Sequence, residues 1–179
     1  LFWMARYMER TDGILRMLKI NCITALDRSG EPDFNWLPVL KVFTTLPPGE
    51  AEQLAENSDE VLRYMIFNRE NSNSIRSIVS RARENTRGAQ DQVTKEVWEG
   101  INEFYLKLND PGLEQAIDRG EQIVMLGSLI NQYLLFNGVA EVTMPRGQGW
   151  NYLNLGKFIE RGLLTADILN VKFSNIAYD

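Results

Sequence analysis

Apolar residues recur every three to four positions along most of the chain, and the alternating pattern of half-buried strands is nearly absent. This period is typical of helices that bury one face, interrupted by short polar segments rich in proline and glycine. The predicted helices span Leu1–Leu26, Trp36–Thr45, Glu60–Phe67, a segment capped by Asn73 or Ser74, Val93–Leu108, Leu113–Glu141, and Trp150 or Asn151 to Ile176. Six or seven helices with short connections predict an all-α helical bundle forming a single domain over residues 1–179.

Two of these helices carry the same Glu-Arg pair, at Glu9-Arg10 and at Glu160-Arg161. The similarity extends beyond the pair, because a small, a basic, an aromatic and an aliphatic residue precede it in both stretches. These residues are Ala5, Arg6, Tyr7 and Met8 in the first stretch and Gly156, Lys157, Phe158 and Ile159 in the second. We therefore interpret the two stretches, Leu1 to Ile20 and Tyr152 to Val171, as similar helices.

The first copy places two small residues, Ala5 and Gly13, one turn before and one turn after Glu9 on the same helix face. The backbone of another helix can approach closely at such positions. We predict that the two copies pack together as a pseudo-symmetric pair with crossed ion pairs. In this arrangement Glu9 reaches Arg161 or Lys157.

In the second copy, Glu160 is expected to reach Arg10 or Arg6 of the first. This helix is apolar nearly all round, which predicts a position inside the bundle with Glu160 and Asp167 at least partly buried. A buried carboxylate needs cations or several hydrogen-bond donors, because an uncompensated charge costs several kcal/mol.

The crossed pairs admit two interpretations. They either fix the register of two helices, or they form the floor of a site in which Glu9 and Glu160 act as an acid/base pair beside arginines that stabilise anions. Chemistry of the second kind requires at least one carboxylate at the bottom of an open pocket. Enclosure of a carboxylate with both oxygens bound to arginine would count against it.

A further group of arginines, Arg76, Arg83 and Arg87, lies on one flank of its helix, with Glu84 beside it. Such a row predicts either an anion-binding cleft, since arginine forks hold carboxylate or phosphate, or a solvated helix edge with salt bridges. The residues proposed to bind a ligand or partner are Arg6, Arg10, Arg83, Glu84, Arg87, Arg161 and Asp167.

The amino-acid composition excludes several classes of binding and catalytic site. The net charge of −5 argues against binding to nucleic acid, which needs a basic surface. The absence of histidine excludes ordinary zinc sites and serine-histidine triads, so we expect no metal and no cofactor. A single cysteine, Cys22, favours a reducing compartment, hence the cytoplasm. The uncharged stretch Gln122 to Ala140 contains polar amides, which favour a buried core helix over a membrane span.

The residues described above resemble the bacterial alpha-E family. The resemblance rests on Phe2 to Arg10, Asn73 to Ile75, Ala82 to Arg87, Glu96 to Glu99 with Asn102, Gly149-Trp150, Leu155-Gly156, Phe158 to Arg161 and Asp167. It spans nearly the whole chain, and it departs from the family pattern at Gly162, where an alanine is usual. Because family members run longer, we expect the chain to be a partial copy of the family domain.

The resemblance implies a genomic and structural context. Alpha-E domains are encoded beside or fused to circularly permuted ATP-grasp proteins and transglutaminase-like peptidases, which implies a system that forms and trims amide bonds. We expect a non-catalytic helical accessory domain that binds such a partner or an acidic peptide. The alternatives are an enzyme that uses Glu9 and Glu160, and a purely structural assembly domain; a homo-oligomer is compatible with either.

Overall fold

The computed structural model describes residues 1–27 and 35–173, and within these ranges every regular element is a helix. The α-helices are α1 (Phe2–Asp27), α2 (Leu37–Phe43), α3 (Pro48–Ala55), α4 (Ser58–Ile66), α5 (Ile75–Arg87), α6 (Lys95–Leu108), α7 (Pro111–Asp118), α8 (Gln122–Thr143) and α9 (Gln148–Phe173). A 3-10 turn, Gln90–Gln92, lies between α5 and α6. The predicted all-α bundle is confirmed.

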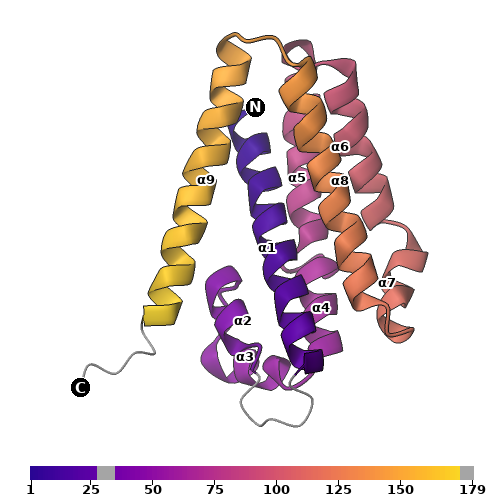
Figure 1. Ribbon diagram of the computed structural model, residues 1–179, viewed down its shortest axis with the longest axis vertical. Helices are drawn as coiled ribbons and strands as arrows, with labels where there is room; N and C mark the ends of the chain where they lie inside the picture. Colours follow the sequence, from indigo (N-terminus) through magenta and orange to yellow (C-terminus); the bar gives the residue numbers. More distant parts are fainter. Residues whose placement is uncertain (28–34, 174–179) are drawn as a thin grey trace.

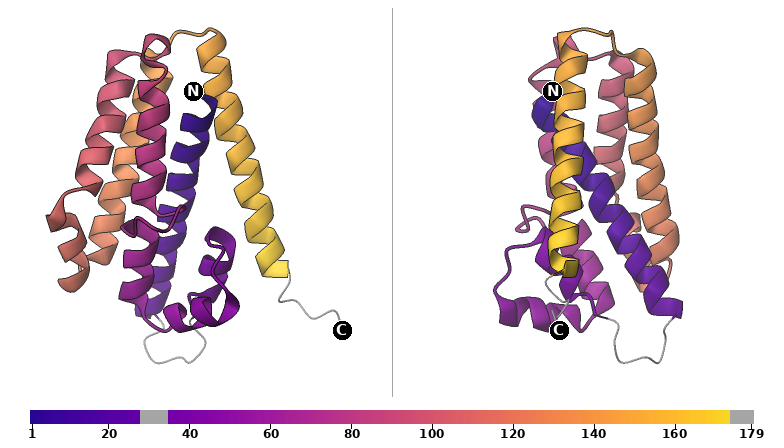
Figure 2. Two further views of the ribbon diagram at one scale, coloured as in Figure 1. Left: turned by 180° about the vertical axis from the view of Figure 1, so that it is seen from behind. Right: turned by 60° about the vertical axis from the view of Figure 1, so that its left-hand side comes forward.

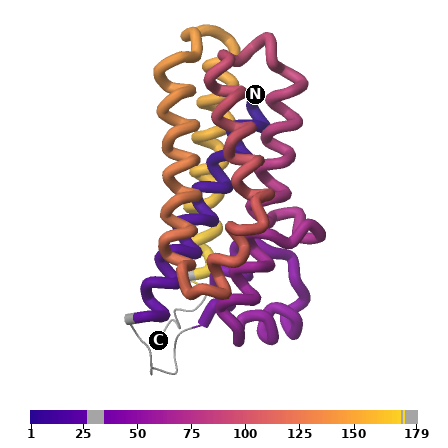
Figure 3. The backbone as a smooth tube through the Cα atoms, turned by 90° about the vertical axis from the view of Figure 1, so that its right-hand side faces the viewer, coloured from indigo at the N-terminus to yellow at the C-terminus, as the bar shows by residue number. Residues whose placement is uncertain are grey.

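Helix α1 lies at the centre of the bundle and contacts α5, α8 and α9 (Figure 1). Helix α6 closes the far side by packing against α5 and α8 (Figure 3). The short helices α2 and α3 lie at one end, where α2 contacts both α1 and α9 (Figure 2). The first and last long helices, which carry the two Glu-Arg pairs, are therefore neighbours.

The core is formed by the apolar faces that the sequence pattern predicts. On α1, Met4, Met8, Leu15 and Leu18 are buried. Their counterparts on α5 and α6 are Ile75, Val79, Ala82, Val97, Ile101, Phe104 and Leu108. The predicted start of α5 is also confirmed, because the Ser74 side chain accepts a hydrogen bond from the Ser77 amide and so satisfies a free donor of the first turn.

One of the predicted helices is divided in the structure. The segment predicted as one helix over Leu113–Glu141 is divided into α7 and α8, because Gly120 adopts a φ of 71° between them. A glycine takes this left-handed conformation without the steric cost of a side chain, so it ends one helix and redirects the chain. The predicted end of the last helix at Ile176 lies outside the described residues.

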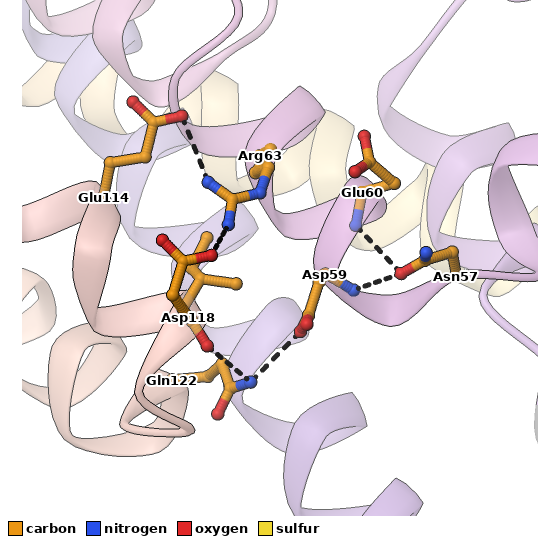
Figure 4. A network of polar contacts seen from close by, with 8 residues as sticks. Asn57, Asp59, Glu60, Arg63, Glu114, Asp118 and Gln122 are labelled. Atoms are coloured by element: carbon orange, nitrogen blue, oxygen red, sulfur yellow. Dashed lines mark hydrogen bonds and ion pairs between the residues drawn. The ribbon is translucent and has the colours of Figure 1, made fainter.

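A polar network fixes the short helix α7 against α4 and α8 (Figure 4). Arg63 of α4 donates to Asp118 over 2.5 Å and to Glu114 over 3.4 Å. The Gln122 amide donates to Asp59 over 3.1 Å. These contacts are partly exposed, so each contributes little stability alone, but together they orient the turn that contains Gly120.

Helix α8 is long and apolar enough to cross a membrane by length and composition. In this fold it instead packs on α1 and α6 and buries Met125, Leu126, Leu129 and Phe136. It is the one helix of this kind among the described residues, and the core helix of a soluble protein passes the same test.

Helix α9 departs from its predicted position inside the bundle. It packs through one face, on which Leu153, Gly156 and Glu160 are buried. Its other faces are exposed, although they carry large apolar side chains such as Tyr152, Leu155 and Leu163. The prediction failed because the described residues cover α9 on one side only, through α1, α2 and a contact from Lys157 to Asn137 of α8.

Candidate functional site

Helices α1 and α9 run side by side (Figures 1 and 2). The two Glu-Arg pairs meet across this contact. Gly156 makes this close contact feasible, because a Cβ built at this position would lie 2.3 Å from the backbone oxygen of Phe2 and 3.2 Å from the Ala5 Cβ. Further along the seam, a Cβ at Gly13 would lie 2.8 Å from a methyl group of Leu164. The small residues therefore set the distance at which the charged side chains meet.

Glu160 is bound by two arginines of the first helix. Arg6 Nε donates to one carboxylate oxygen over 2.6 Å, and Arg10 Nε donates to the other over 2.5 Å. The Glu160 side chain is only 1% exposed. Both partners that the sequence suggested for Glu160 are thus used at once. Arg10 also donates to Asn73 over 3.3 Å, which links the seam to the loop before α5.

Glu9 is bound by one arginine and one tyrosine. Arg161 Nε donates to Glu9 Oε1 over 2.6 Å, and the Tyr133 hydroxyl of α8 donates to Oε2 over 2.7 Å. Of the two predicted partners, Arg161 is the one that binds. Lys157 instead donates to Asn137 of α8 over 2.7 Å. The Glu9 residue is 5% exposed, so neither carboxylate is free in solvent.

These contacts confirm the predicted crossed pairing. Arg161 of the second copy binds Glu9 of the first, and Arg10 of the first binds Glu160 of the second. This is the reciprocity of an isologous interface, here between two helices of one chain. The symmetry is incomplete at the second oxygen of each glutamate. On Glu160 this oxygen accepts from Arg6, whereas on Glu9 it accepts from the Tyr133 hydroxyl.

The electrostatics follow from burial and hydrogen bonding. Burial raises the pKa of Tyr133, and its hydrogen bond to Glu9 raises it further, so the phenol stays protonated. The hydrogen bond to Glu9 raises the pKa of Arg161, which stays charged. A positively charged guanidinium and a neutral hydroxyl donor thus hold Glu9.

Asp12 lies one turn after Glu9 on α1 and accepts a hydrogen bond from Arg16 Nε over 2.7 Å. The structure also buries Asp12 and leaves its Oδ1 atom without a hydrogen-bond partner. Burial raises the pKa of the Asp12 carboxyl. The burial of Asp12 could have been predicted from its spacing, because a residue three positions after Glu9 lies on the same face of α1.

The space beside the ion pairs is small. A cavity of about 10 Å³ lies next to Glu9 and Tyr133, between α1, α8 and α9. A cavity of that size holds at most one water molecule. The arrangement therefore neutralises two carboxylates and joins two helices, but offers a substrate no access to Glu9 at this cavity.

The remaining predicted binding residues lie elsewhere. Arg83 donates to Asn102 of α6 over 2.7 Å and stacks on Trp98 and Tyr105. Glu84 pairs with Arg83 and with Arg87, so these three residues form a salt-bridged edge between α5 and α6.

Asp167 of α9 was expected to be at least partly buried, and it is exposed. The seam closes around Glu160, and no described residue covers Asp167, which lies two turns further along α9. The structure thus unites Arg6, Arg10 and Arg161 with the two glutamates, but places Asp167 away from them.

Within residues 1–27 and 35–173, no group of three acidic, cysteine or histidine side chains is placed to hold a metal ion. The charged groups of the seam are already bound to one another. The described residues at the seam therefore contain no set of free ligands for a metal.

Comparison with known proteins places the chain in a family. Residues 1–179 match Alpha-E, described as a predicted alpha-helical domain with a conserved ER motif. Comparisons with curated proteins and with solved structures give no match. The match covers the whole chain, the fold is helical, and the Glu-Arg pairs form its central contact, so the chain belongs to the Alpha-E family.

Proposed function

We propose that this chain is a non-catalytic helical accessory domain that binds a partner protein in the cytoplasm of a bacterium. The partner class follows from the family context, in which the neighbours are ATP-grasp and transglutaminase-like proteins. The domain would then serve a system that forms or trims amide bonds. Its own part is recognition, with the bond-forming chemistry supplied by the partner.

The observation that carries this proposal is a row of exposed apolar side chains along α9. The exposed positions lie on one side of the helix and are Tyr152, Leu155, Phe158, Ile159, Leu163, Leu169 and Phe173, each between 39% and 57% exposed. A soluble protein rarely leaves such a row in contact with water unless another molecule covers it. We name this row the α9 apolar face and propose it as the docking surface for the ATP-grasp protein.

The state of the two glutamates supports binding over acid/base chemistry. A general acid or base must come within hydrogen-bond reach of its substrate. Glu160 has both oxygens on arginines and is almost fully buried. Glu9 is enclosed by Arg161 and Tyr133 beside a cavity that holds at most one water. The seam therefore favours a role in which the ion pairs position α9 on the bundle.

The ion pairs of the seam also argue against an acidic peptide as the ligand. Arg6, Arg10 and Arg161 already pair with glutamates, so a peptide carboxylate would have to displace an internal ion pair. Replacing a buried pair in this way leaves a buried charge uncompensated. We therefore place the partner on the α9 apolar face and not at the seam.

Co-purification of the full-length protein with the ATP-grasp protein encoded beside it tests the proposal, together with ATP turnover in the presence and absence of the domain. We expect a stable complex that the double variant Leu155→Glu and Leu163→Glu abolishes. Val142→Glu is the matched control, because Val142 is an exposed apolar residue of α8 outside this face. A complex that survives the double variant, or no complex at all, would refute the proposed docking surface.

A further inference from the structure

A hollow of about 360 Å³ lies beside α5, where Tyr105 and Asn109 at the end of α6 also line it. Its lining includes three arginines, Arg69, Arg76 and Arg81, and two serines, Ser77 and Ser80. None of the described side chains that line it is acidic. The volume is at the lower end of the range of small-molecule sites. Of the arginine row predicted from the sequence, Arg76, Arg83 and Arg87, only Arg76 lines this hollow.

Arg76 forms a fixed positive wall of the hollow. Its guanidinium donates to the backbone oxygens of Leu108, over 2.9 Å and 3.2 Å, and of Phe67, over 3.2 Å. These bonds hold the side chain in one place between the end of α6 and the end of α4. Burial lowers the pKa of Arg76, the charge of Glu114 opposes this change, and the charge of Arg69 adds to the lowering. Arg69 and Arg76 are therefore within electrostatic range of each other.

Arg69 and Arg81 are cations without an anionic partner among residues 1–27 and 35–173. Neither side chain forms an ion pair or a hydrogen bond with any residue in the described part of the chain. Arg81 only approaches the ring of Tyr7, at 6.0 Å. Two acidic residues of the neighbouring helices pair with other arginines, Glu114 with Arg63 and Glu84 with Arg83 and Arg87. Two positive charges in one hollow repel each other and favour an anion between them.

Ser77 and Ser80 add neutral donors to the same wall. The Ser77 hydroxyl accepts a hydrogen bond from Ser74 over 2.9 Å, which leaves its own proton free to donate. The Ser80 hydroxyl has no hydrogen-bond partner among the described residues. Both are partly exposed, and their spacing places them beside Arg76 and Arg81 on adjacent turns of α5.

We propose that this hollow binds the phosphate group of a small soluble phosphate monoester. A phosphate dianion matches the two unpaired charges of Arg69 and Arg81, and its three terminal oxygens can accept from guanidinium and hydroxyl donors in several directions. A carboxylate carries one charge and has two oxygens in one plane, so it would leave donors of this set unused. The site lies outside the seam and the α9 apolar face, and does not depend on the proposed function.

Titration calorimetry of the whole chain with inorganic phosphate and with phosphoserine, at constant ionic strength, tests the assignment. We expect one site, and a loss of about tenfold in affinity, or ~1.4 kcal/mol, for each of Arg69→Ala and Arg81→Ala. Arg87→Ala is the matched control, since it removes the same charge from an exposed position of the same helix outside the hollow. We expect less than about a twofold change for it.

The outcomes separate the alternatives. Absence of phosphate binding would overturn the site. An equal loss of affinity in Arg87→Ala would also overturn it, because the loss would then come from the change in net charge and not from the hollow. Succinate bound as tightly as phosphoserine would overturn the preference for phosphate. Binding of phosphatidic acid vesicles without binding of phosphoserine would place the phosphate on a lipid and overturn the soluble ligand. Arg69 is exposed and lies in a loop, so Arg69→Ala keeps the test valid if Arg81→Ala unfolds.

Discussion

Gly156 of α9 lies so close to Phe2 of α1 that an added Cβ would sit 2.3 Å from the Phe2 backbone oxygen. Backbone cannot move away as a flexible side chain can, so Gly156→Ala must separate the helices at the position that sets the ion pairs. We expect a loss of about 3 kcal/mol in the free energy of unfolding, measured by urea denaturation.

The control for this substitution is on the same helix. Gly162 has no atom within 4 Å of an added Cβ, so Gly162→Ala changes helix propensity without a steric clash. We expect it to stabilise the protein by about 0.5–1 kcal/mol. If both substitutions had the same effect, the close approach of α1 and α9 would not be the source of the constraint.

Glu160→Gln tests the seam directly. The substitution removes the charge that neutralises Arg6 and Arg10, while the side chain keeps its size. We expect a loss of about 3 kcal/mol in the free energy of unfolding, because it leaves two cations in a partly buried position without their anion. Glu99→Gln is the comparison, since Glu99 pairs with Lys95 on an exposed surface of α6 and should cost less than about 0.5 kcal/mol.

The seam could be predicted in large part from the sequence, and the reason is physical. The order small, basic, aromatic, aliphatic, Glu-Arg occurs twice, so two helices carry the same charged pair on equivalent faces. Each buried glutamate then needs the arginine of the other helix, which predicts the pairing of Glu9 with Arg161. The part played by Tyr133 could not be predicted. Its position depends on how α8 is rotated against α1, and a helical period alone does not fix that rotation.

Two other features escaped prediction for different reasons. The α9 apolar face was interpreted as buried, because an apolar helix surface looks the same in sequence whether the bundle or another molecule covers it. The hollow on α5 combines Arg81 with Arg69, which belongs to the loop before the helix. Helical periodicity predicts which residues of one helix share a face. It does not predict that a loop side chain such as Arg69 lies next to that face.

Asp12 gives a pH dependence whose sign can be stated. Burial raises its pKa in the folded protein above the ordinary value of 3.8, so the folded state binds the proton more tightly than the unfolded state. The stability that this group contributes is therefore present at low pH and is lost as the pH rises through the folded-state pKa. We expect the free energy of unfolding of Asp12→Asn, relative to the natural sequence, to increase from about pH 4 to pH 7.

Urea denaturation at a series of pH values measures this difference. Asp167→Asn is the control, because it makes the same substitution at an exposed position of α9. A relative stability of Asp12→Asn that falls toward neutral pH would mean that the bond to Arg16 outweighs burial, and that the Asp12 pKa is lowered.

Cys22 should be a slow nucleophile in the folded protein. Its side chain is buried on α1, and burial, with a smaller effect of Asp59, raises the pKa of the thiol to about 11. The thiolate is the reactive form, so two units above the usual pKa reduce its population at pH 8 by about a hundredfold. We expect iodoacetamide to modify Cys22 at least ~100 times more slowly in buffer than in urea, with a rate that still rises above pH 9. Equal rates in the two solvents would place the thiol in contact with water and contradict the packing of α1.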